Sequence, residues 1–264
     1  MALAAQGGED IYRVSDREGF LEAIGPDRTI VIEQGAKIVL SFLDDFPGPL
    51  ESSHIAWNSN FDGSSLVIQN VENLVIAGEG TRESALMAEP RYVFVLEFQN
   101  CRDIMLQNLK LGHTTGGYCD SGVLGVKNCN GFTVEDCLLF GCGTEGLTVN
   151  RSEDLILTGS EIVDCSYGIM TCSYSQNLNF EDCVFRDNEE YYGVDIFDCS
   201  GVLFSRCLFR NNRAGFTPGF MNNGSEVPVR VEFCSFDSIR CTALFNCENF
   251  VLENNEFDHI TETE

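Results

Sequence analysis

Acidic and tyrosine side chains recur together through the middle of the chain. Glu145 is followed by Tyr167, then by Glu190, Tyr191 and Asp195. Tyrosine rings can stack on the faces of sugars, and two carboxyl groups can act as the acid and the base of glycoside cleavage. These residue types indicate a saccharide site if the fold brings them to one side. The solvated loops of an acidic protein would show the same residue types, so that interpretation stays open.

A histidine and three cysteines form a second candidate group. Cys119, Cys142 and Cys165 follow one another at intervals of 23 residues, and His113 aligns close to Cys142. One imidazole and three thiolates could hold zinc in a tetrahedral site. However, no short Cys-x2–4-Cys pair accompanies them. A corner ladder of small buried residues, with His113 on a loop, accounts for the same spacing.

Both groups belong to a hydrophobic repeat of about 23 residues. One repeated apolar position is occupied by Phe185, Phe209, Phe236 and Phe257. Within each unit, apolar and polar residues alternate over three short runs, which is strand periodicity with one buried face. Bends occur at Asn and Asp, which tolerate a left-handed backbone; Asn108, Asp136, Asp182 and Asn254 are the examples.

The repeat predicts an all-β fold, a single-stranded right-handed parallel β-helix with three strands per coil. Equivalent residues would then stack at roughly 4.8 Å, the distance between paired strands. The hexapeptide steps typical of a left-handed β-helix are absent. Each coil cannot bury its apolar face alone, so its neighbours supply the core.

The segments outside the repeat have their own patterns. Residues 1–10 are small, polar and acidic, and we expect them to be disordered. An N-cap-like Asp and an apolar face predict a short capping helix over 16–25. Residues 41–63 suggest an irregular surface loop, and about 65–260 form the repeat coils. We expect residues 1–264 to be one domain.

Two of the repeat units read NCNGFTVEDCLLFGCGTEGLTV and DCSGVLFSRCLFRNNRAGF. In these units the chain resembles the pectin-lyase-like right-handed β-helix proteins, over about residues 65–260. The segment GHTTGGYCDSGVL…FGCGTEGL is also similar to uncharacterised bacterial secreted members of that group. The resemblance implies the fold but no single reaction, because the fold hosts lyases, hydrolases, epimerases and non-catalytic scaffolds. It implies a secreted, periplasmic or cell-surface protein, although the sequence shows no signal peptide.

In the resembled enzymes, the active groove lies on the outer face of the strand that opens each coil. Here those strands would be 122–126, 146–149, 168–171 and 193–196. Thr148 and Asp195 would point outward, with Ile169 or Met170 at the equivalent place in between. The resemblance implies these catalytic candidates: Glu145, Glu190, Asp195 and His113. It implies these substrate-binding candidates: Tyr118, Asp120, Tyr167, Tyr191, Tyr192 and Arg213. Glu145 and Asp195 would be two coils apart, on the order of 10 Å, near the upper end for an inverting carboxylate pair.

The reaction itself stays open. The resembled lyases use Arg or Lys with Ca²⁺ held by acidic side chains, and this groove offers no Lys and only Arg213. The paired-Asp and Gly-His-Gly motifs of the polygalacturonase group are also absent, since Gly112-His113-Thr114 does not match. We therefore expect a protein that binds or processes carbohydrate, as a polysaccharide lyase or a glycoside hydrolase. A non-catalytic scaffold or surface-interaction module is the alternative, and a metal-binding protein is a third. No cofactor is required, although Ca²⁺ could bind.

The composition limits the partners. The chain carries 41 Asp and Glu against 16 Lys and Arg, a net charge of -25. Nucleic acid and anionic membranes need basic surfaces, so both are excluded. The charge also disfavours a polyanionic substrate unless a cation mediates, and it favours a monomer. No apolar run reaches the length of a membrane span. Most of the 13 cysteines fall on the repeat, so we expect mostly free, buried thiols.

Overall fold

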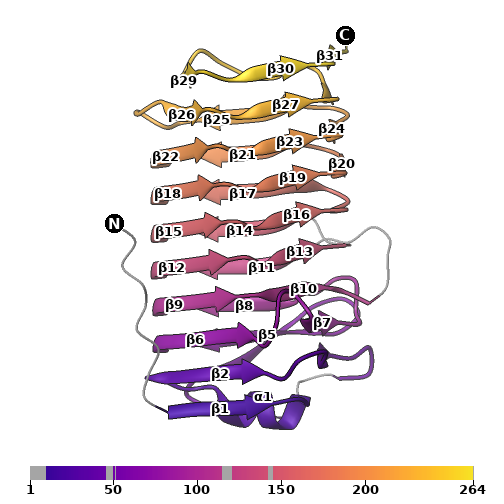
Figure 1. Ribbon diagram of the computed structural model, residues 1–264, viewed down its shortest axis with the longest axis vertical. Coiled ribbons are helices and arrows are strands. Elements are labelled where there is room, and N and C mark those ends of the chain that lie inside the picture. Colours follow the sequence, from indigo (N-terminus) through magenta and orange to yellow (C-terminus); the bar gives the residue numbers. More distant parts are fainter. Residues whose placement is uncertain (1–9, 46–49, 51, 115–120, 142–144, 264) are drawn as a thin grey trace.

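The structure is a computed structural model that describes residues 10–45, 50, 52–114, 121–141 and 145–263. The chain rises from the N-terminus as a stack of coils, with each strand lying against its equivalent in the next coil (Figure 1). The apolar columns of the repeat face inward and form one continuous core along this stack.

Three long sheets and one short sheet contain the described strands. Sheet A comprises β1 (Asp10–Val14), β2 (Arg28–Ile32), β6 (Glu72–Gly78), β9 (Arg102–Gln107), β12 (Asn130–Glu135), β15 (Glu153–Thr158), β18 (Gln176–Glu181), β22 (Ser200–Ser205), β26 (Val229–Glu232) and β29 (Phe250–Glu253). Sheet B comprises β3 (Lys37–Ser41), β7 (Ser84–Ala88), β10 (Leu109–His113), β13 (Leu138–Phe140), β16 (Glu161–Val163), β19 (Val184–Arg186), β23 (Leu208–Arg210), β27 (Ser235–Asp237) and β30 (Glu256–Asp258). Sheet C comprises β4 (Ile55–Ser59), β5 (Ser64–Gln69), β8 (Leu96–Gln99), β11 (Gly122–Lys127), β14 (Glu145–Asn150), β17 (Gly168–Ser173), β21 (Val194–Phe197) and β25 (Phe220–Asn223). Sheet D comprises β20 (Glu189–Glu190), β24 (Arg213–Ala214), β28 (Arg240–Cys241) and β31 (Thr261–Glu262).

Successive coils pair in parallel, as β12 with β15 and β14 with β17 do. This confirms the parallel β-helix with strands of sheets C, A and B in each repeated coil. Sheet D adds a short fourth strand to the later coils, which the repeat did not predict. The strand β4 pairs antiparallel with β5, so the prediction of an irregular loop over 41–63 is wrong for Ile55–Ser59.

The predicted phenylalanine column stacks inside the solenoid. Phe209 is in register with Phe185 on one side and Phe236 on the other. Their ring centroids are 4.8 and 4.9 Å apart, and Phe236 lies 5.1 Å from Phe257. Near-parallel rings at this spacing add attraction to the free energy of burial. The spacing of the repeat therefore places the aromatic ladder correctly.

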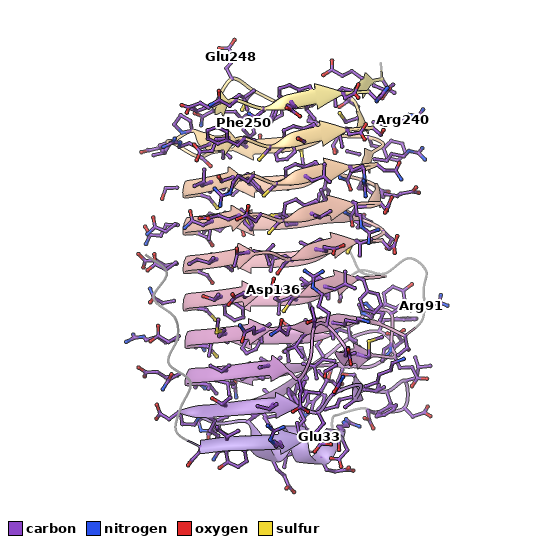
Figure 2. The ribbon with its side chains drawn as sticks, in the orientation of Figure 1. Glu33, Arg91, Asp136, Arg240, Glu248 and Phe250 are labelled. Atoms are coloured by element: carbon purple, nitrogen blue, oxygen red, sulfur yellow. The ribbon has the colours of Figure 1, made fainter. Side chains whose placement is uncertain are left out.

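The corners between sheets use left-handed backbone, as the sequence predicted. The corner from sheet A to sheet B has positive φ at these residues: Asn108 (56°), Asp136 (52°), Asp182 (54°) and Asn254 (54°). Figure 2 shows Asp136 about midway along the solenoid. Asn and Asp adopt this conformation with little cost because their short polar side chains form local hydrogen bonds. The corners therefore repeat without distorting the strands.

One short helix lies at the N-terminal end of the solenoid (Figure 1). The helix α1 (Arg17–Ala23) is capped by the Asp16 side chain, which accepts a hydrogen bond of 2.8 Å from the Gly19 amide. Its buried residues Phe20 and Leu21 join the core, which confirms the capping helix. The predicted disorder of residues 1–9 lies outside the described residues, whereas Asp10 already begins β1. Of the helices in the described ranges, none is long and apolar enough to cross a membrane.

The cysteines of the described residues are free thiols, and all but Cys247 are buried. Cys207 and Cys234 lie on successive coils in the inward column that follows the corner from sheet A to sheet B. Their thiols donate to backbone carbonyl groups, as Cys207 does to Phe180 at 3.3 Å. These small side chains therefore fill space between sheets rather than cross-linking the coils.

Candidate functional site

The outer face of sheet C carries a column of polar side chains at the centre of its strands. Gly125, Thr148, Thr171 and Asp195 are in register on β11, β14, β17 and β21. The predicted outward positions of Thr148 and Asp195 fit this register. The equivalent residue on β17 is Thr171, whereas Ile169 and Met170 are buried. A strand alternates its faces, so a shift of one residue exchanges a core position for an outer one.

A hydrogen-bonded network connects this column to Glu145. The Tyr192 hydroxyl donates to Glu145 Oε2 at 2.7 Å, and the Thr148 hydroxyl donates to Glu145 Oε1 at 2.7 Å. The Thr171 hydroxyl in turn donates to the Tyr192 oxygen at 3.2 Å. Glu145 is 8% exposed, so both of its oxygens are occupied in a nearly covered site. Charge-assisted hydrogen bonds of this kind fix the direction of a carboxylate.

A glycine lets the Tyr192 ring reach this network. A Cβ at Gly168 would lie 2.6 Å from the Tyr192 ring, closer than real Cβ contacts. Tyr192 follows β20 and is hydrogen-bonded through its backbone amide to the Tyr167 carbonyl at 3.2 Å. The loop before β21 thus folds back over the start of β17. This local geometry carries Tyr192 from one coil to Glu145 in another.

The environment shifts the pKa of two groups on this face in the same direction. Burial raises the pKa of the Asp195 carboxyl. Burial first, and then the negative charge of Glu145, raises the pKa of Tyr192 well above its ordinary range. Asp195 contributes to the same effect through its charge, so the tyrosine hydroxyl lies close to both acids. Tyr192 is therefore a neutral hydrogen-bond donor at neutral pH, and Asp195 holds its proton to higher pH than an exposed carboxyl does.

A further carboxyl group, which the sequence interpretation missed, lies on the same column. Glu97 on β8 is in register with Gly125. Burial raises its pKa, and the side-chain amide of Asn58 donates to its oxygens at 3.0 and 3.2 Å. A Cβ at Gly125 would lie 3.2 Å from Glu97, so the glycine leaves the column open there. From Glu97 to Asp195 the column spans four strand spacings, roughly 19 Å.

An aromatic cluster borders the network. Tyr167 and Tyr191 stack with their centroids 4.3 Å apart, and Tyr192 lies edge-on to Tyr167 at 6.0 Å. Phe216 extends this cluster, with its centroid 5.6 Å from Tyr191. Tyr191 is 40% exposed and Phe216 is 74% exposed, so both rings offer a face to a ligand. The cluster brings the predicted Tyr167, Tyr191 and Tyr192 together with Glu145.

His113, a catalytic candidate from the sequence, is buried and does not lie on this face. It ends β10 and is 5% exposed, and its Nε2 lies 2.8 Å from the Val93 carbonyl. Burial lowers its pKa. Gly141 lies beside its backbone, which agrees with the predicted alignment of this coil. A buried neutral imidazole cannot serve as an acid or base for a ligand on the outer face of sheet C.

The other predicted site residues have different places. Tyr118, Asp120, Cys119 and Cys142 lie outside the described residues. Cys165 is buried with its thiol 3.7 Å from the Val163 carbonyl. Glu190 ends β20 in register with Ala214, and the exposed Arg213 is in register with Glu189. Figure 2 shows Arg240, the neighbour of Arg213 in sheet D, projecting from the side of that sheet. Arg213 is therefore not among the contacts of Glu145 or Tyr192 that the described residues make.

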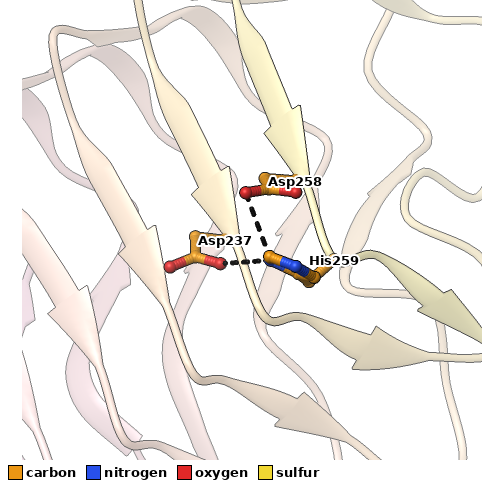
Figure 3. A group of neighbouring side chains, drawn as sticks. All are labelled: Asp237, Asp258 and His259. Carbon is orange, nitrogen blue, oxygen red and sulfur yellow. Dashed lines mark hydrogen bonds and ion pairs between the residues drawn. The ribbon is translucent and has the colours of Figure 1, made fainter.

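Within the described ranges, one group of side chains has the spacing of metal ligands. Asp237, Asp258 and His259 place one ligand atom each within 4.8 Å of one another (Figure 3). His259 Nδ1 lies 3.3 Å from Asp237 and 3.2 Å from Asp258, and its side chain is 73% exposed. Exposed acidic pairs with a histidine are common on acidic proteins, so these contacts are those of an ordinary surface ion pair. The group is also separate from the Glu145 network in the fold, near the C-terminal coil.

Some site residues could have been found from the sequence. Thr171 follows Thr148 by one repeat, and strict alignment of these two units would have identified it. Glu97 precedes Gly125 by 28 residues, the step that also separates Ile104 from Phe132, so alignment of these units would have identified it too. Phe216 leaves no such signal, because it lies in a segment between β24 and β25 whose length differs from the equivalent loops.

The comparisons with known proteins agree with this fold. The family model for the "Right handed beta helix region" matches residues 96–230, a span that includes Glu145, Tyr192 and Asp195. A comparison with curated protein sequences found no match. An alginate lyase from Paenibacillus sp. str. FPU-7 has a TM-score of 0.50 at 10% identity, covering 96% of this chain and 98% of its own.

Two other solved structures are similar at lower scores. The pectate lyase pelN from Paenibacillus sp. 0602 has a TM-score of 0.49 at 8% identity and covers 87% of this chain and 71% of its own. The surface adhesin PfbA of Streptococcus pneumoniae has a TM-score of 0.40 at 8% identity and covers 97% and 85%. At such identities the likeness concerns the fold alone, because one fold hosts many functions.

Proposed function

Because the chain belongs to the right-handed β-helix family, we propose that it binds and hydrolyses a carbohydrate chain on the outer face of sheet C. The observation that carries this proposal is the hydrogen bond between Tyr192 and Glu145 beside the Asp195 carboxyl. Titratable groups whose pKa values are shifted and which gather on one face are candidates for a functional site. The network holds Glu145 in a fixed direction, and burial raises the pKa of Asp195 beside it.

Asp195 would act as the acid of hydrolysis and Glu145 as the base. Asp195, whose pKa burial raises, gives its proton to the glycosidic oxygen as the bond from C1 to that oxygen breaks. Glu145 accepts a proton from a water molecule, whose oxygen forms the new bond to C1. Glu145 is hydrogen-bonded to Thr148 on β14, and Asp195 lies two strand spacings from Thr148 on β21, roughly 10 Å. This spacing leaves room for the water of an inverting mechanism.

The aromatic cluster would hold the sugar rings. Tyr191 and Phe216 present exposed faces next to the network, and apolar sugar faces pack on such rings. Tyr167 supports Tyr191 from behind through a stack of 4.3 Å. The cluster therefore gives a saccharide a fixed position relative to Glu145.

The charge of this face favours hydrolysis of a neutral saccharide over elimination from a uronate. A lyase must neutralise the carboxylate of its substrate, which requires a cation at the site. Burial is the cause of the raised pKa of Asp195, and no cation among the described residues opposes it. Glu97 adds a second acid to the same column. Of the described cations, Lys127 acts on Glu97 at one end of the column, whereas the pKa of Asp195 shows burial as its cause, so a polyuronate would meet uncompensated charge at Asp195 and Ca²⁺ is not part of the proposal.

We place this activity outside the cytoplasm, because polymeric carbohydrate does not cross membranes. The buried thiols are sheltered from oxidants there, as Cys137 and Cys183 are. A monomer is the expected state, because a chain with a net charge of -25 repels its own copies.

Product analysis tests the proposal. The full chain is incubated with xylan, mannan and a β-glucan, and with polygalacturonate and alginate as anionic counterparts. We expect new reducing ends from at least one neutral polysaccharide, and none from Asp195→Asn or Glu145→Gln. Unsaturated products from the uronates, detected by ultraviolet absorbance, would assign a lyase instead. Binding without any product would assign a carbohydrate-binding module.

The near burial of Glu145 favours that non-catalytic function as the second candidate. At 8% exposure its carboxylate offers little surface to a water molecule. In that case the Tyr192 network would only hold the aromatic cluster in place. The Glu145→Gln variant would then bind saccharide as the wild type does.

A further inference from the structure

A second concave surface lies at the corner where sheet C passes into sheet A. It has a volume of about 580 Å³, which falls in the range of roughly 300–1,000 Å³ found for small-ligand sites. Its lining comes from the corner of four successive coils, at Asn128, Arg151, Tyr174 and Asp198. We call it the corner groove. Three strand spacings give it a length of roughly 14 Å, suited to an extended ligand.

Two residues of this corner are bulky for the backbone that they adopt. At the equivalent place in other coils, Asn100, Asn128 and Asp198 are left-handed, with φ of 54°, 52° and 50°. Arg151 and Tyr174 adopt it with φ of 48° and 52°, although bulky side chains disfavour this conformation. Arg206 and Phe233 are left-handed in the same way at the corner from sheet A to sheet B, so the backbone conformation alone does not mark a site.

What distinguishes this corner is that Arg151 and Tyr174 belong to a platform of aromatic rings. The Arg151 guanidinium lies over the Tyr174 ring, 5.0 Å from its centroid. Tyr174 meets Phe197 edge-on at 5.3 Å. Tyr174 is 48% exposed and Phe197 is 43% exposed, so this platform faces solvent at the groove. Tyr174 lines the groove and Phe197 lies beside it, and exposed rings of this kind can pack against sugar faces.

The polar groups around the platform have spare hydrogen-bonding capacity. Among the residues that the structure describes, the side chains of Gln176 and Asp198 form no hydrogen bond. Arg151 donates only to Asn150, at 3.1 Å, and forms no ion pair with the described residues. Amide, carboxylate and guanidinium groups pair with vicinal hydroxyl groups. The lining contains the carboxylates of Glu153 and Asp198 against the one guanidinium, which disfavours an anionic ligand.

The groove adjoins the outer face of sheet C. Asp195 and Phe197 are two residues apart on β21, so their side chains lie on the same face, roughly 7 Å apart along the strand. Phe197 therefore connects the column that contains Asp195 with the Tyr174 platform. The two surfaces are neighbours but have separate sets of side chains.

We propose that the corner groove is a second saccharide-binding site, which holds a neutral oligosaccharide against the ring of Tyr174. The class of ligand rests on the proposed function, whereas the site itself rests on the groove. Catalysis at Glu145 and Asp195 is not needed for it. A saccharide chain held there would be retained at the protein surface beside the proposed reaction site.

Calorimetric titration of the full chain with xylohexaose, mannohexaose and cellohexaose tests the assignment. The test variant is Tyr174→Asn, because Asn occupies the same corner at position 128 and tolerates its backbone. The matched control is Phe233→Asn, an exposed aromatic with φ of 55° at the other corner, away from the groove. Asp195→Asn reports on the outer face of sheet C. Thermal unfolding of each variant checks that it folds.

We expect at least one hexaose to bind, with a Kd raised tenfold or more in Tyr174→Asn and unchanged in Phe233→Asn. Retention of this binding in Asp195→Asn would show that the groove acts by itself, and its loss would show one continuous site that includes the groove. Full binding in Tyr174→Asn would overturn the assignment of the corner groove as a saccharide-binding site. If Asp195→Asn then abolished that binding, the proposed function would stand alone. No binding of any hexaose would overturn both proposals.

Discussion

The hydroxyl of Tyr192 donates a hydrogen bond of 2.7 Å to the carboxylate of Glu145, although 47 residues separate them in the sequence. The bond crosses coils, and it depends on Gly168, where a Cβ would lie 2.6 Å from the tyrosine ring. One short contact thus connects a loop to the face of sheet C. It is also the contact whose removal has the most direct consequence for the proposed function.

Replacing Tyr192 by Phe should lower the rate of saccharide cleavage about 10- to 100-fold. A hydrogen bond to a charged group contributes about 1.5–3 kcal/mol, which corresponds to this factor. Initial rates on the neutral polysaccharide that the wild type cleaves provide the measurement. Tyr12→Phe is the matched control, since Tyr12 packs under the Arg28 guanidinium at the far end of the solenoid. An unchanged rate in Tyr192→Phe would contradict a role for this bond in catalysis.

Asp195→Asn should make the protein more stable at neutral pH. Burial raises the pKa of Asp195 in the folded state, so the folded protein binds this proton more tightly than the unfolded chain. Wild-type stability from this group is therefore present below the ordinary Asp pKa of about 3.9 and is lost as pH rises through the folded-state pKa. Because the Asn side chain cannot ionise, the variant does not lose this stability as the pH rises. Urea unfolding at a series of pH values should show the difference at neutral pH and its disappearance in acid.

Asp182→Asn provides the opposite case as a control. The Arg206 guanidinium lowers the pKa of Asp182 through a hydrogen bond of 2.8 Å. This stability is present above the ordinary Asp pKa and is lost as pH falls through the folded-state pKa. Asp182→Asn should therefore be slightly less stable than the wild type at neutral pH. If both substitutions changed the free energy of unfolding at neutral pH in the same direction, the assignment for Asp195 would be wrong.

Phe209→Ala should lower the free energy of unfolding by about 3–5 kcal/mol, the range for buried Phe-to-Ala changes. Phe209 is 1% exposed and stacks on Phe185 and Phe236, so its removal opens a cavity between coils. Phe233→Ala, at an exposed corner, should cost less than about 0.5 kcal/mol. Chemical denaturation of the two variants makes the comparison. Equal costs would show that the ladder does not stabilise the solenoid.

Arg82→Ala should destabilise the fold by about 2–3 kcal/mol, because hydrogen bonds to charged groups are lost. Arg82 donates to the Asp136 carbonyl at 2.8 Å and to Glu161 at 2.6 Å, which ties the segment after β6 to later coils. Arg13→Ala is the control, since its ion pair with Glu79 is exposed and should matter little. Thermal unfolding of the two variants provides the measurement. Equal melting temperatures would contradict a stabilising role for the Arg82 contacts.

Thiol labelling should distinguish Cys247 from the buried cysteines. Burial raises the pKa of Cys137 to about 12, so hardly any reactive thiolate forms at neutral pH. Of the eleven free thiols of the described residues, ten are buried and Cys247 is exposed. In a Cys119→Ser, Cys142→Ser background, Ellman's reagent should modify one thiol quickly and the others only after unfolding. More than one fast thiol, or a fast thiol in Cys247→Ser, would contradict the burial.

The solenoid was predictable because each coil contacts only its neighbours in the stack, so the spacing along the chain defines the contacts. The spacing of Phe185, Phe209 and Phe236 specifies which residues stack, since each coil must bury its apolar face against the next. The same holds for the corner at Asp136, where the residue type signals the backbone conformation. The capping helix was predictable from the Asp16 cap and its apolar face.

The candidate site was predictable only in part. The sequence indicated that Tyr191 and Asp195 share one coil and that Glu145 lies two coils before it, and this much follows from the repeat. It did not separate Thr171 from Ile169 or Met170, because a shift of one residue decides which face of a strand is buried.

The sequence by itself therefore determined the period, the inward ladders and the left-handed corners, because strand pairing and burial repeat with the chain. Only the tertiary structure decided that Tyr192 reaches Glu145 over Gly168, and that His113 is buried. It also decided that Tyr174 and Phe197 form one platform. The physical reason is that these contacts depend on how loops of unequal length fold onto the coils. Such folding is set by packing in three dimensions rather than by spacing along the chain.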